Sequence, residues 1–221
     1  GEDGLERIHN RRVIVFGVGG VGGWCAECLI RSGIQHLTIV DFDRVAASNI
    51  NRQLPANTET IGMLKVEVLS EYFRKINPEA EVIAMQERYG EDSSLLFNLN
   101  NYDYVIDAID SVADKAHLIL AACDSETTLY SSMGAALKSD PTRIRTAEFG
   151  KITGDPLARA LRQRFKKERF PARKFTGVYS DEPRMKNRIE EKANGSLMQV
   201  TAAFGLTLAS LVINDITKAT H

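Results

Sequence analysis

Cysteine is scarce in this chain of 221 residues, which has only Cys25, Cys28 and Cys123. So few cysteines do not suit a disulfide framework in a chain of this size. Cys25 and Cys28 have the C-x-x-C spacing of zinc and redox sites, but no second C-x-x-C completes a zinc site. They also fall in a segment with a helical pattern, so we interpret all three cysteines as packing residues.

Long uninterrupted apolar runs and a secretory signal pattern are also lacking. The most apolar segment, residues 197–216, is interrupted by polar side chains, which favours a buried helix over a membrane span. The composition, with 43% hydrophobic and 26% charged residues, is typical of a soluble protein. We therefore expect a cytoplasmic protein with no membrane partner.

Net charge is nearly absent, at −1, but the charges are unevenly distributed. Residues 143–192 contain fifteen Lys and Arg against seven Asp and Glu, whereas the rest of the chain contains thirteen against twenty-two. A strip of such strong positive charge favours the binding of a polyanion on one face of the protein.

Apolar, β-branched runs alternate with helix-like runs over the first 133 residues. We expect strands near residues 13–18, 37–43, 81–86, 104–110 and 128–133. We expect helices near residues 21–31, 62–76, 93–98 and 112–122. This alternation predicts an α/β fold with a doubly wound, mostly parallel Rossmann-like sheet and a ligand at the carboxyl ends of its strands.

The rhythm changes after residue 133. The stretch "TRIRTAEFGKI" (residues 142–152) predicts C-terminal antiparallel or edge strands. A basic amphipathic helix is expected over 155–168 and a polar stretch from about 174 to 195, in which about 180–195 forms a mobile loop. A long apolar C-terminal helix is expected over about 196–217.

The stretch "GVGGVGGW" contains Gly17, Gly19 and Gly22 in a G-x-G-x-x-G pattern between an expected strand and an expected helix. Glycines permit a tight turn and let phosphates approach backbone N–H groups at the helix N-terminus. No Gly-Lys-Ser/Thr follows, so the loop is not a P-loop. Asp41 stands where dinucleotide folds bind a ribose hydroxyl, and to this point a nicotinamide cofactor and ATP fit equally well.

The polar residues further along favour a triphosphate. Arg52 and Lys65 supply positive charge, for which a redox site has little use. In a triphosphate site this charge stabilises the negative charge that builds on the α-phosphate during attack and on the departing pyrophosphate. Asp107 and Asp110 end the strand "YVIDAID", where a carboxylate can hold the magnesium that bridges phosphate oxygens.

Each of these residues also has a plain structural interpretation. Arg52 and Lys65 can be solvated surface charges, Asp43 and Asp107 can cap turns, and Asn49 can be a turn residue. It is their combination after one glycine loop that favours a nucleotide site.

The motifs "GVGGVGGW", "VDFDRVAASNINRQ", "IGMLKVE", "INPEAEV" and "DAIDS" resemble those of the ubiquitin-activating-type adenylating enzymes, which include the molybdopterin- and thiamine-pathway activators. The resemblance implies adenylation of a carboxylate with ATP and Mg²⁺. It assigns nucleotide binding to Gly17, Gly19, Gly20, Gly22, Asp41, Asp43, Asn49, Arg52, Gln53, Lys65 and Asp110. Arg52, Lys65 and Asp110 are the implied catalytic residues, and Asp110 is the implied metal ligand.

In the second half, "DAIDSVADKA", "SDPTRI", "GDPLARALRQRFKK", "GVYSDEP" and "GSLMQVTAAFGL" resemble the tRNA threonylcarbamoyladenosine dehydratases in particular. That resemblance implies adenylation and cyclisation of the threonylcarbamoyl group on tRNA. The basic strip then supplies candidate tRNA contacts at Arg159, Arg162, Arg164, Lys166, Lys167, Arg169, Arg173 and Lys174. An ordinary solvated basic helix is the alternative.

The resemblance implies a single adenylating domain over residues 1–221, with a nucleotide-binding core over 1–135 and a C-terminal elaboration over 136–221. It also implies a homodimer, and a sulfur-transfer partner protein is a further candidate partner. Three alternative functions stay open: adenylation of the C-terminus of a ubiquitin-like sulfur-carrier protein, nicotinamide-dependent redox chemistry, and nucleotide sensing without chemistry.

Overall fold

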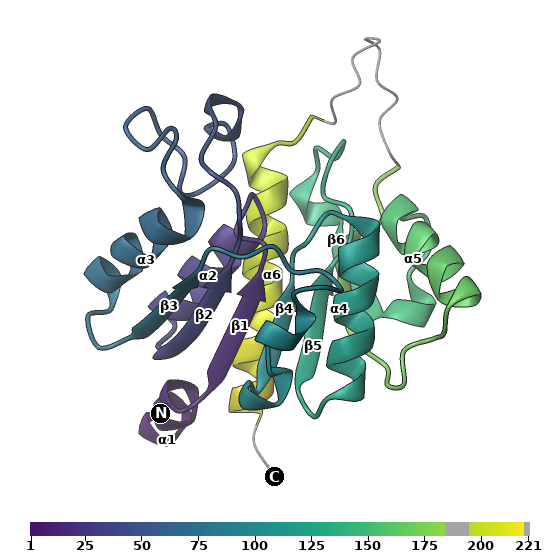
Figure 1. The fold of residues 1–221 in the computed structure, drawn as a ribbon, viewed down its shortest axis with the longest axis horizontal. Coiled ribbons are helices and arrows are strands. Elements are labelled where there is room, and N and C mark those ends of the chain that lie inside the picture. Colours follow the sequence, from purple (N-terminus) through teal and green to yellow (C-terminus); the bar gives the residue numbers. More distant parts are fainter. Residues whose placement is uncertain (184–194, 219–221) are drawn as a thin grey trace.

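The computed structural model describes residues 1–183 and 195–218, and within them seven strands form one sheet in the order β3-β2-β1-β4-β5-β7-β6 (Figure 1). The strands are β1 (Arg12–Phe16), β2 (His36–Val40), β3 (Glu81–Met85), β4 (Tyr104–Asp107), β5 (Thr128–Ser132), β6 (Ile144–Glu148) and β7 (Thr176–Ser180). Each pairing between these strands is parallel except that of β6 with β7, which is antiparallel. The predicted fold class is confirmed.

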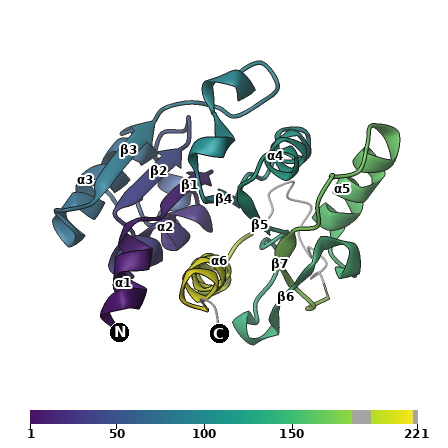
Figure 2. The same cartoon turned by 90° about the horizontal axis from the view of Figure 1, so that it is seen from below.

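Helices cover both faces of the sheet (Figure 2). One face carries α1 (Glu2–His9), α2 (Gly22–Arg31), α3 (Lys65–Ile76) and α6 (Met198–Thr217), and the other carries α4 (Val112–Asp124) and α5 (Pro156–Lys167). Along β1 the side chains alternate between the two cores: Val15 packs in the cluster of Phe204 from α6, and Ile14 in that of Ile119 from α4. A parallel strand covered on both faces needs a continuous apolar run, which "VIVF" supplies.

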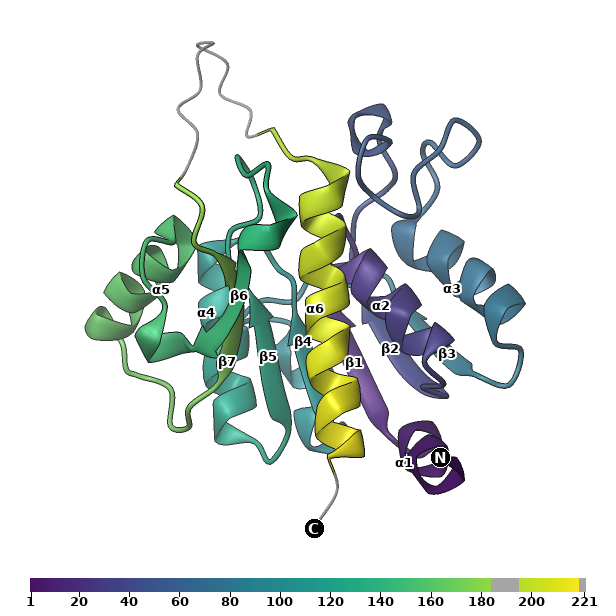
Figure 3. The same cartoon turned by 180° about the vertical axis from the view of Figure 1, so that it is seen from behind.

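Helix α6 lies along the sheet and touches α2 closely (Figure 3). A Cβ atom on Gly205 would lie 2.4 Å from the carbonyl oxygen of Val21, so only glycine lets the two helices approach this far. By length and composition α6 could span a membrane, but half of its most apolar window is buried inside the protein. The prediction of a buried apolar helix over about 196–217 is confirmed.

Most other predicted elements are confirmed, with ends shifted by a few residues. The helix expected from residue 62 begins only at Lys65, because Gly62 has a φ of +88°, which is incompatible with a right-handed helix. The expected helix near 93–98 is a single 3₁₀ turn at Ser94–Leu96, and the N-terminal helix α1 was not expected.

The interpretation of residues after 174 as a polar stretch is wrong over Thr176–Ser180. This segment is β7, an internal strand between β5 and β6 whose Val178 is fully buried. Its sequence, TGVYS, has no run of apolar residues because Gly177 and Ser180 occupy buried positions where larger side chains are usual. The predicted antiparallel pairing in the C-terminal part is confirmed for β6 with β7.

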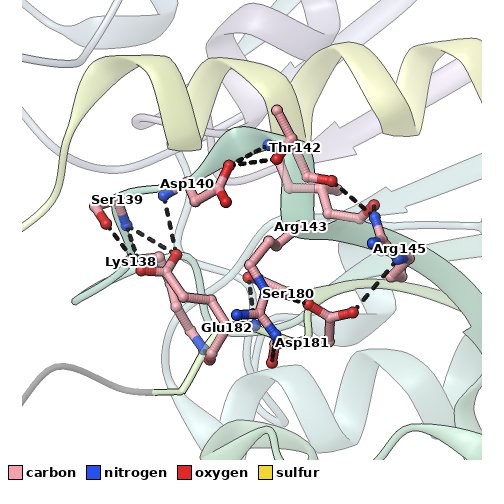
Figure 4. Close-up of polar contacts among 10 residues, drawn as sticks. Lys138, Ser139, Asp140, Thr142, Arg143, Arg145, Ser180, Asp181 and Glu182 are labelled. Atoms are coloured by element: carbon pink, nitrogen blue, oxygen red, sulfur yellow. Dashed lines mark hydrogen bonds and ion pairs between the residues drawn. The ribbon is translucent and has the colours of Figure 1, made fainter.

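The mobile loop expected over about 180–195 is also wrong for its first residues (Figure 4). The Glu182 carboxylate accepts hydrogen bonds from the backbone N–H groups of Ser139 and Asp140, both at 3.0 Å. Asp181 pairs with Arg143 at 2.7 Å, and this hydrogen bond lowers the pKa of the Asp181 carboxyl. The rest of the expected loop, residues 184–194, lies outside the described residues.

Candidate nucleotide-binding site

The glycine loop joins the end of β1 to the start of α2. Gly17 has a φ of +82°, and a Cβ atom there would lie 2.8 Å from the Ala108 carbonyl oxygen. A Cβ atom on Gly22 would lie 1.8 Å from the Gly17 carbonyl oxygen, so no other residue fits. No described side chain caps the N-terminus of α2, which leaves N–H groups of its first turn available to an anion.

Asp41 follows β2 and holds the glycine loop from beside it. One carboxylate oxygen accepts the Val18 N–H at 2.8 Å, and the other accepts the Asp43 N–H at 2.9 Å. Burial raises the pKa of the Asp41 carboxyl, and these two hydrogen bonds oppose that rise because they favour the ionised form. Asp41 therefore has a structural task in addition to its predicted contact with ribose.

A cavity of about 580 Å³ lies at the carboxyl ends of the strands. Nine of the predicted nucleotide-binding residues line it: Gly17, Gly19, Gly20, Asp41, Asp43, Arg52, Gln53, Lys65 and Asp110. Gly22 and Asn49 do not. Gly22 lies under the loop, and the side-chain amide oxygen (Oδ1) of Asn49 accepts the Ala46 N–H at 3.0 Å, as in the turn interpretation.

The two predicted cations reach the cavity from different elements. Arg52 follows the short 3₁₀ helix Ala47–Asn49, and its guanidinium donates to the Ser48 carbonyl oxygen at 2.9 Å. Lys65 is the first residue of α3 and is 4% exposed, so it is not a solvated surface charge. Its ammonium lies 2.7 Å from the Asp43 carboxylate, whose side chain is half exposed toward the cavity.

The structure separates the two carboxylates at the end of β4. Asp110 is exposed on the cavity wall. Asp107 is fully buried, pairs with Lys115 at 2.9 Å and accepts the Ile109 N–H at 3.1 Å, as in its turn-capping interpretation. Of the two carboxylates, Asp110 is therefore the one that lines the cavity, and Asp107 does not reach it.

Two residues that line the cavity were not predicted: an aromatic, Phe42, and a cation, Arg88. The Phe42 ring lines the cavity and is 51% exposed, which leaves a face on which a planar base can stack. The Arg88 guanidinium lies 5.6 Å from the centre of this ring and is held by Asp114 at 2.9 Å. The only sequence signal for Phe42 is its position directly after Asp41.

The described residues fit a nucleoside triphosphate. The loop is a backbone cradle that side chains would fill, and the Gln53 Oε1 atom is buried without a hydrogen-bond partner among the described residues. The cavity volume lies in the usual range for a small-molecule site. No cluster of three His, Cys, Asp or Glu side chains that could hold a metal ion occurs in the described part of the chain.

The predicted tRNA-binding residues divide into two groups. The first group has partners within the protein: Arg162 donates to the Ile152 carbonyl oxygen at 2.9 Å, Arg164 pairs with Glu168 at 2.8 Å, Lys174 pairs with Glu148 at 3.1 Å, and Arg169 pairs with Asp124. Arg173 also belongs here, because it donates to the carbonyl oxygens of Cys123 and Ala122 at 3.0 Å, where α4 ends.

The second group is Arg159, Lys166 and Lys167, which are exposed on α5. None of the three has an ion-pair partner within 4.0 Å in the described part of the chain. Among the predicted tRNA-binding residues, these three can turn to a polyanion without breaking an ion pair to the described part of the chain.

A doubly wound sheet, a glycine loop and a carboxyl-end cavity with Arg52, Lys65 and Asp110 define an α/β nucleotide-binding protein with a site suited to a triphosphate. The model of the ThiF family matches residues 1–221. The chain belongs to the ThiF family.

Similarity to related proteins extends over nearly the whole chain. It is 37% identical over 233 residues to the tRNA threonylcarbamoyladenosine dehydratase of Haemophilus influenzae, covering 98% of this chain and 89% of that protein. The structure is similar to that of the E. coli tRNA N6-threonylcarbamoyladenosine dehydratase in complex with AMP, with a TM-score of 0.92, 35% identity, and coverage of 99% and 90% of the two chains. The complex of the same enzyme with ATP has a TM-score of 0.91, with equal identity and coverage.

Proposed function

We propose that this chain is an ATP-dependent dehydratase that adenylates the carboxylate of threonylcarbamoyladenosine in tRNA and cyclises it, releasing AMP and pyrophosphate. The observation that carries the proposal is one cavity in which a backbone cradle, Arg52, Lys65 and Asp110 converge. Likeness over nearly the whole chain to proteins named for this reaction supports the choice of substrate.

In the first step a substrate carboxylate oxygen forms a bond to the α-phosphorus of ATP, and the bond to the β-phosphate oxygen breaks. The N–H groups of the loop and the charges of Arg52 and Lys65 stabilise the negative charge that grows on the phosphates. An ionised carboxylate needs no general base. Mg²⁺ held by Asp110 would supply further positive charge between phosphate oxygens.

In the second step the carbamoyl group of the substrate attacks the activated carbonyl carbon, one proton is lost and AMP leaves. The two groups belong to one molecule, so proximity favours ring closure. The net change in the nucleoside is the loss of one water.

The cysteines support an intramolecular reaction over transfer through an enzyme thiol. Cys25 is fully buried, and burial raises its pKa far above the usual value. Burial also raises the pKa of Cys28, and that of Cys123 to about 11. Burial thus disfavours the nucleophilic thiolate form of all three, and the sequence holds no other cysteine.

For substrate binding we propose that Arg159, Lys166 and Lys167 contact the tRNA backbone, and that Arg162, Arg164, Arg169, Arg173 and Lys174 contribute mainly by holding the basic region in place. The family resemblance supports a homodimer working in the cytoplasm. Light scattering of the purified chain tests the dimer, and a mass of one chain would contradict it.

The deciding experiment incubates the protein with Mg-ATP and tRNA that carries threonylcarbamoyladenosine, digests the RNA and weighs the nucleoside. We expect the loss of one water together with AMP formation. An unchanged nucleoside, accompanied by adenylation of the C-terminus of a small sulfur-carrier protein, would replace this proposal with the alternative one.

A further inference from the structure

Asp107 and Lys115 form an ion pair that is sealed from solvent beneath the candidate site. Both side chains are 0% exposed, and the Lys115 ammonium lies 2.9 Å from a carboxylate oxygen of Asp107. Asp107 ends β4 and Lys115 lies in the first turns of α4, so the pair closes the junction between strand and helix. Neither residue lines the cavity.

The pair binds both backbone polar groups of one residue, Ile109, and so contacts both peptide units that flank it. Asp107 accepts the N–H of Ile109 at 3.1 Å, and Lys115 donates to the carbonyl oxygen of Ile109 at 2.9 Å. Ser131 on the neighbouring strand β5 donates its hydroxyl to Asp107 at 2.7 Å and so fixes the carboxylate. Ile109 is thus held from its own strand, the next strand and the following helix.

This held residue lies between two parts of the site. On one side Ala108 packs against the glycine loop: its carbonyl oxygen would be 2.8 Å from a Cβ atom on Gly17, and its own Cβ atom 3.2 Å from one on Gly22. On the other side comes Asp110, whose carboxylate is exposed on the cavity wall. A shift of the Ile109 backbone would therefore move the Asp110 carboxylate relative to the loop.

A contribution to the stability of the fold does not by itself explain why a buried ion pair occupies this place. Removing two charges from water is costly, and apolar side chains of similar volume often serve a protein core as well or better. A carboxylate and an ammonium at this place do what apolar side chains cannot: they bind the N–H and the C=O of one residue, in two consecutive peptide units, at the same time.

We propose that Asp107 and Lys115 are positioning residues that fix the backbone of Ile109 and thereby orient the Asp110 carboxylate toward the nucleotide site. This inference rests on the proposed function for the role of Asp110. It adds two residues that contact neither nucleotide nor metal, and Ser131 as their support.

The test uses the double variant Asp107→Asn/Lys115→Met, which removes both charges together and leaves no unpaired buried ion. We expect kcat for AMP formation to fall by about tenfold to a hundredfold, because small displacements of a reacting group cost that much. The Mg²⁺ concentration for half-maximal rate should rise, while the Kd for ATP without Mg²⁺ changes less than about twofold, because the glycine loop and the cations are intact.

Hydrogen exchange gives a readout that does not depend on turnover. Amides in a peptide spanning residues 107–111 should exchange faster in the double variant, while those of β1 and α2 keep their wild-type rates. Ser131→Ala, a milder change that keeps the ion pair, should shift the Mg²⁺ dependence and the local exchange in the same direction by a smaller amount.

Tyr104→Phe is the matched control at the opposite end of β4. It removes the hydrogen bond from the Tyr104 hydroxyl to Asp215, at 2.9 Å, and should lower the melting temperature without changing the Mg²⁺ dependence. The inference is overturned if the double variant and Ser131→Ala keep wild-type Mg²⁺ dependence and exchange, or if Tyr104→Phe changes them equally.

Failure of the proposed function gives a different result. In that case the wild-type chain forms no AMP with modified tRNA. The variants can still be compared with the wild type by their Mg²⁺-dependent ATP binding and by the hydrogen exchange of residues 107–111. A wild-type chain that forms AMP beside variants with an unchanged Mg²⁺ profile would refute the positioning role alone.

Discussion

Of the two predicted cations in the candidate site, Arg52 is the one whose replacement should affect the stability of the fold least. It lines the cavity, and among the described residues its guanidinium donates to the Ser48 carbonyl oxygen and the Asn51 side chain, at 2.9 and 2.8 Å. Lys65, in contrast, is buried against Asp43, so its removal would leave a carboxylate without its partner. Substitution of Arg52 therefore separates catalysis from stability.

We expect Arg52→Ala to lower kcat for AMP formation by about a hundredfold to a thousandfold, the usual cost of losing one group that stabilises developing charge. Its melting temperature should remain that of the wild type. Arg31→Ala is the control and should keep full activity, because it removes an ion pair with Glu27 at 2.8 Å and a hydrogen bond to the Tyr72 hydroxyl at 3.4 Å, and none of these residues lines the cavity. Wild-type turnover in Arg52→Ala would refute the assigned role.

Two glycines in helices allow a second test at the residue scale. Gly22→Ala should lower the free energy of unfolding by about 1–3 kcal/mol and abolish ATP binding, because its Cβ atom would lie 1.8 Å from the Gly17 carbonyl oxygen. In Gly4→Ala the new Cβ atom meets only the end of the Arg7 side chain, at 3.9 Å. This variant should raise the free energy of unfolding by about 0.5–1 kcal/mol, because alanine has the higher helix propensity. Thermal unfolding and nucleotide titration check both, and equal stabilities would contradict the loop geometry.

At the scale of single elements, helix α5 has two different ends. Asp155 caps its N-terminus by accepting the Ala158 N–H at 2.8 Å, and its other carboxylate oxygen accepts the N–H of the cavity residue Gly134 at 3.2 Å. The exposed basic residues Lys166 and Lys167 lie in its last turn, where positive charge also complements the helix dipole. The helix is thus anchored beside the cavity and charged at its other end.

The triple variant Arg159→Ala/Lys166→Ala/Lys167→Ala should weaken tRNA binding and reduce the slope of log K against log salt by roughly one unit per lost phosphate contact. ATP binding should not change. Lys75→Ala on α3, a surface lysine paired with Glu71, is the control for loss of charge alone. An unaltered salt slope would return α5 to the interpretation as an ordinary solvated helix.

Arg173 should behave differently from these three. Arg173→Ala should lower the free energy of unfolding by about 1–3 kcal/mol, because the carbonyl groups at the end of α4 lose their donor. Chemical denaturation measures this, and tRNA affinity at temperatures where the variant is folded should stay near that of the wild type. A stable variant with impaired tRNA binding would place Arg173 in the contact surface instead.

At the scale of the whole molecule, ligand binding should raise the free energy of unfolding and therefore the melting temperature. A ligand present at one hundred times its Kd stabilises the folded state by about 2.7 kcal/mol. For a chain of this size that corresponds to a rise in melting temperature of roughly 5–10 °C. Mg-ATP should produce this rise and NAD should not, since Arg52 and Lys65 face the cavity; the reverse ranking would favour the redox alternative.

Sequence reasoning succeeded where local pattern and tertiary position coincide. The glycine loop, Asp41, Arg52 and Lys65 were expected at one site, and all except Gly22 of the loop line the cavity. It failed where the partner is distant in sequence: β7 forms by pairing with β5 and β6, and Arg173 binds the end of α4, more than forty positions away. No periodicity within either segment carries that information.

The sequence by itself determined the alternation of strands and helices, the glycine loop and the identity of the charges near it, because these depend on local sterics and on hydrophobic period. Only the tertiary structure decided how those charges are used. Of the two carboxylates three positions apart, it turned Asp110 to the cavity and buried Asp107 against Lys115, because the strand ends at Asp107 and the chain turns there. Which of two equal side chains meets solvent depends on the elements that pack around them, and those come from the whole chain.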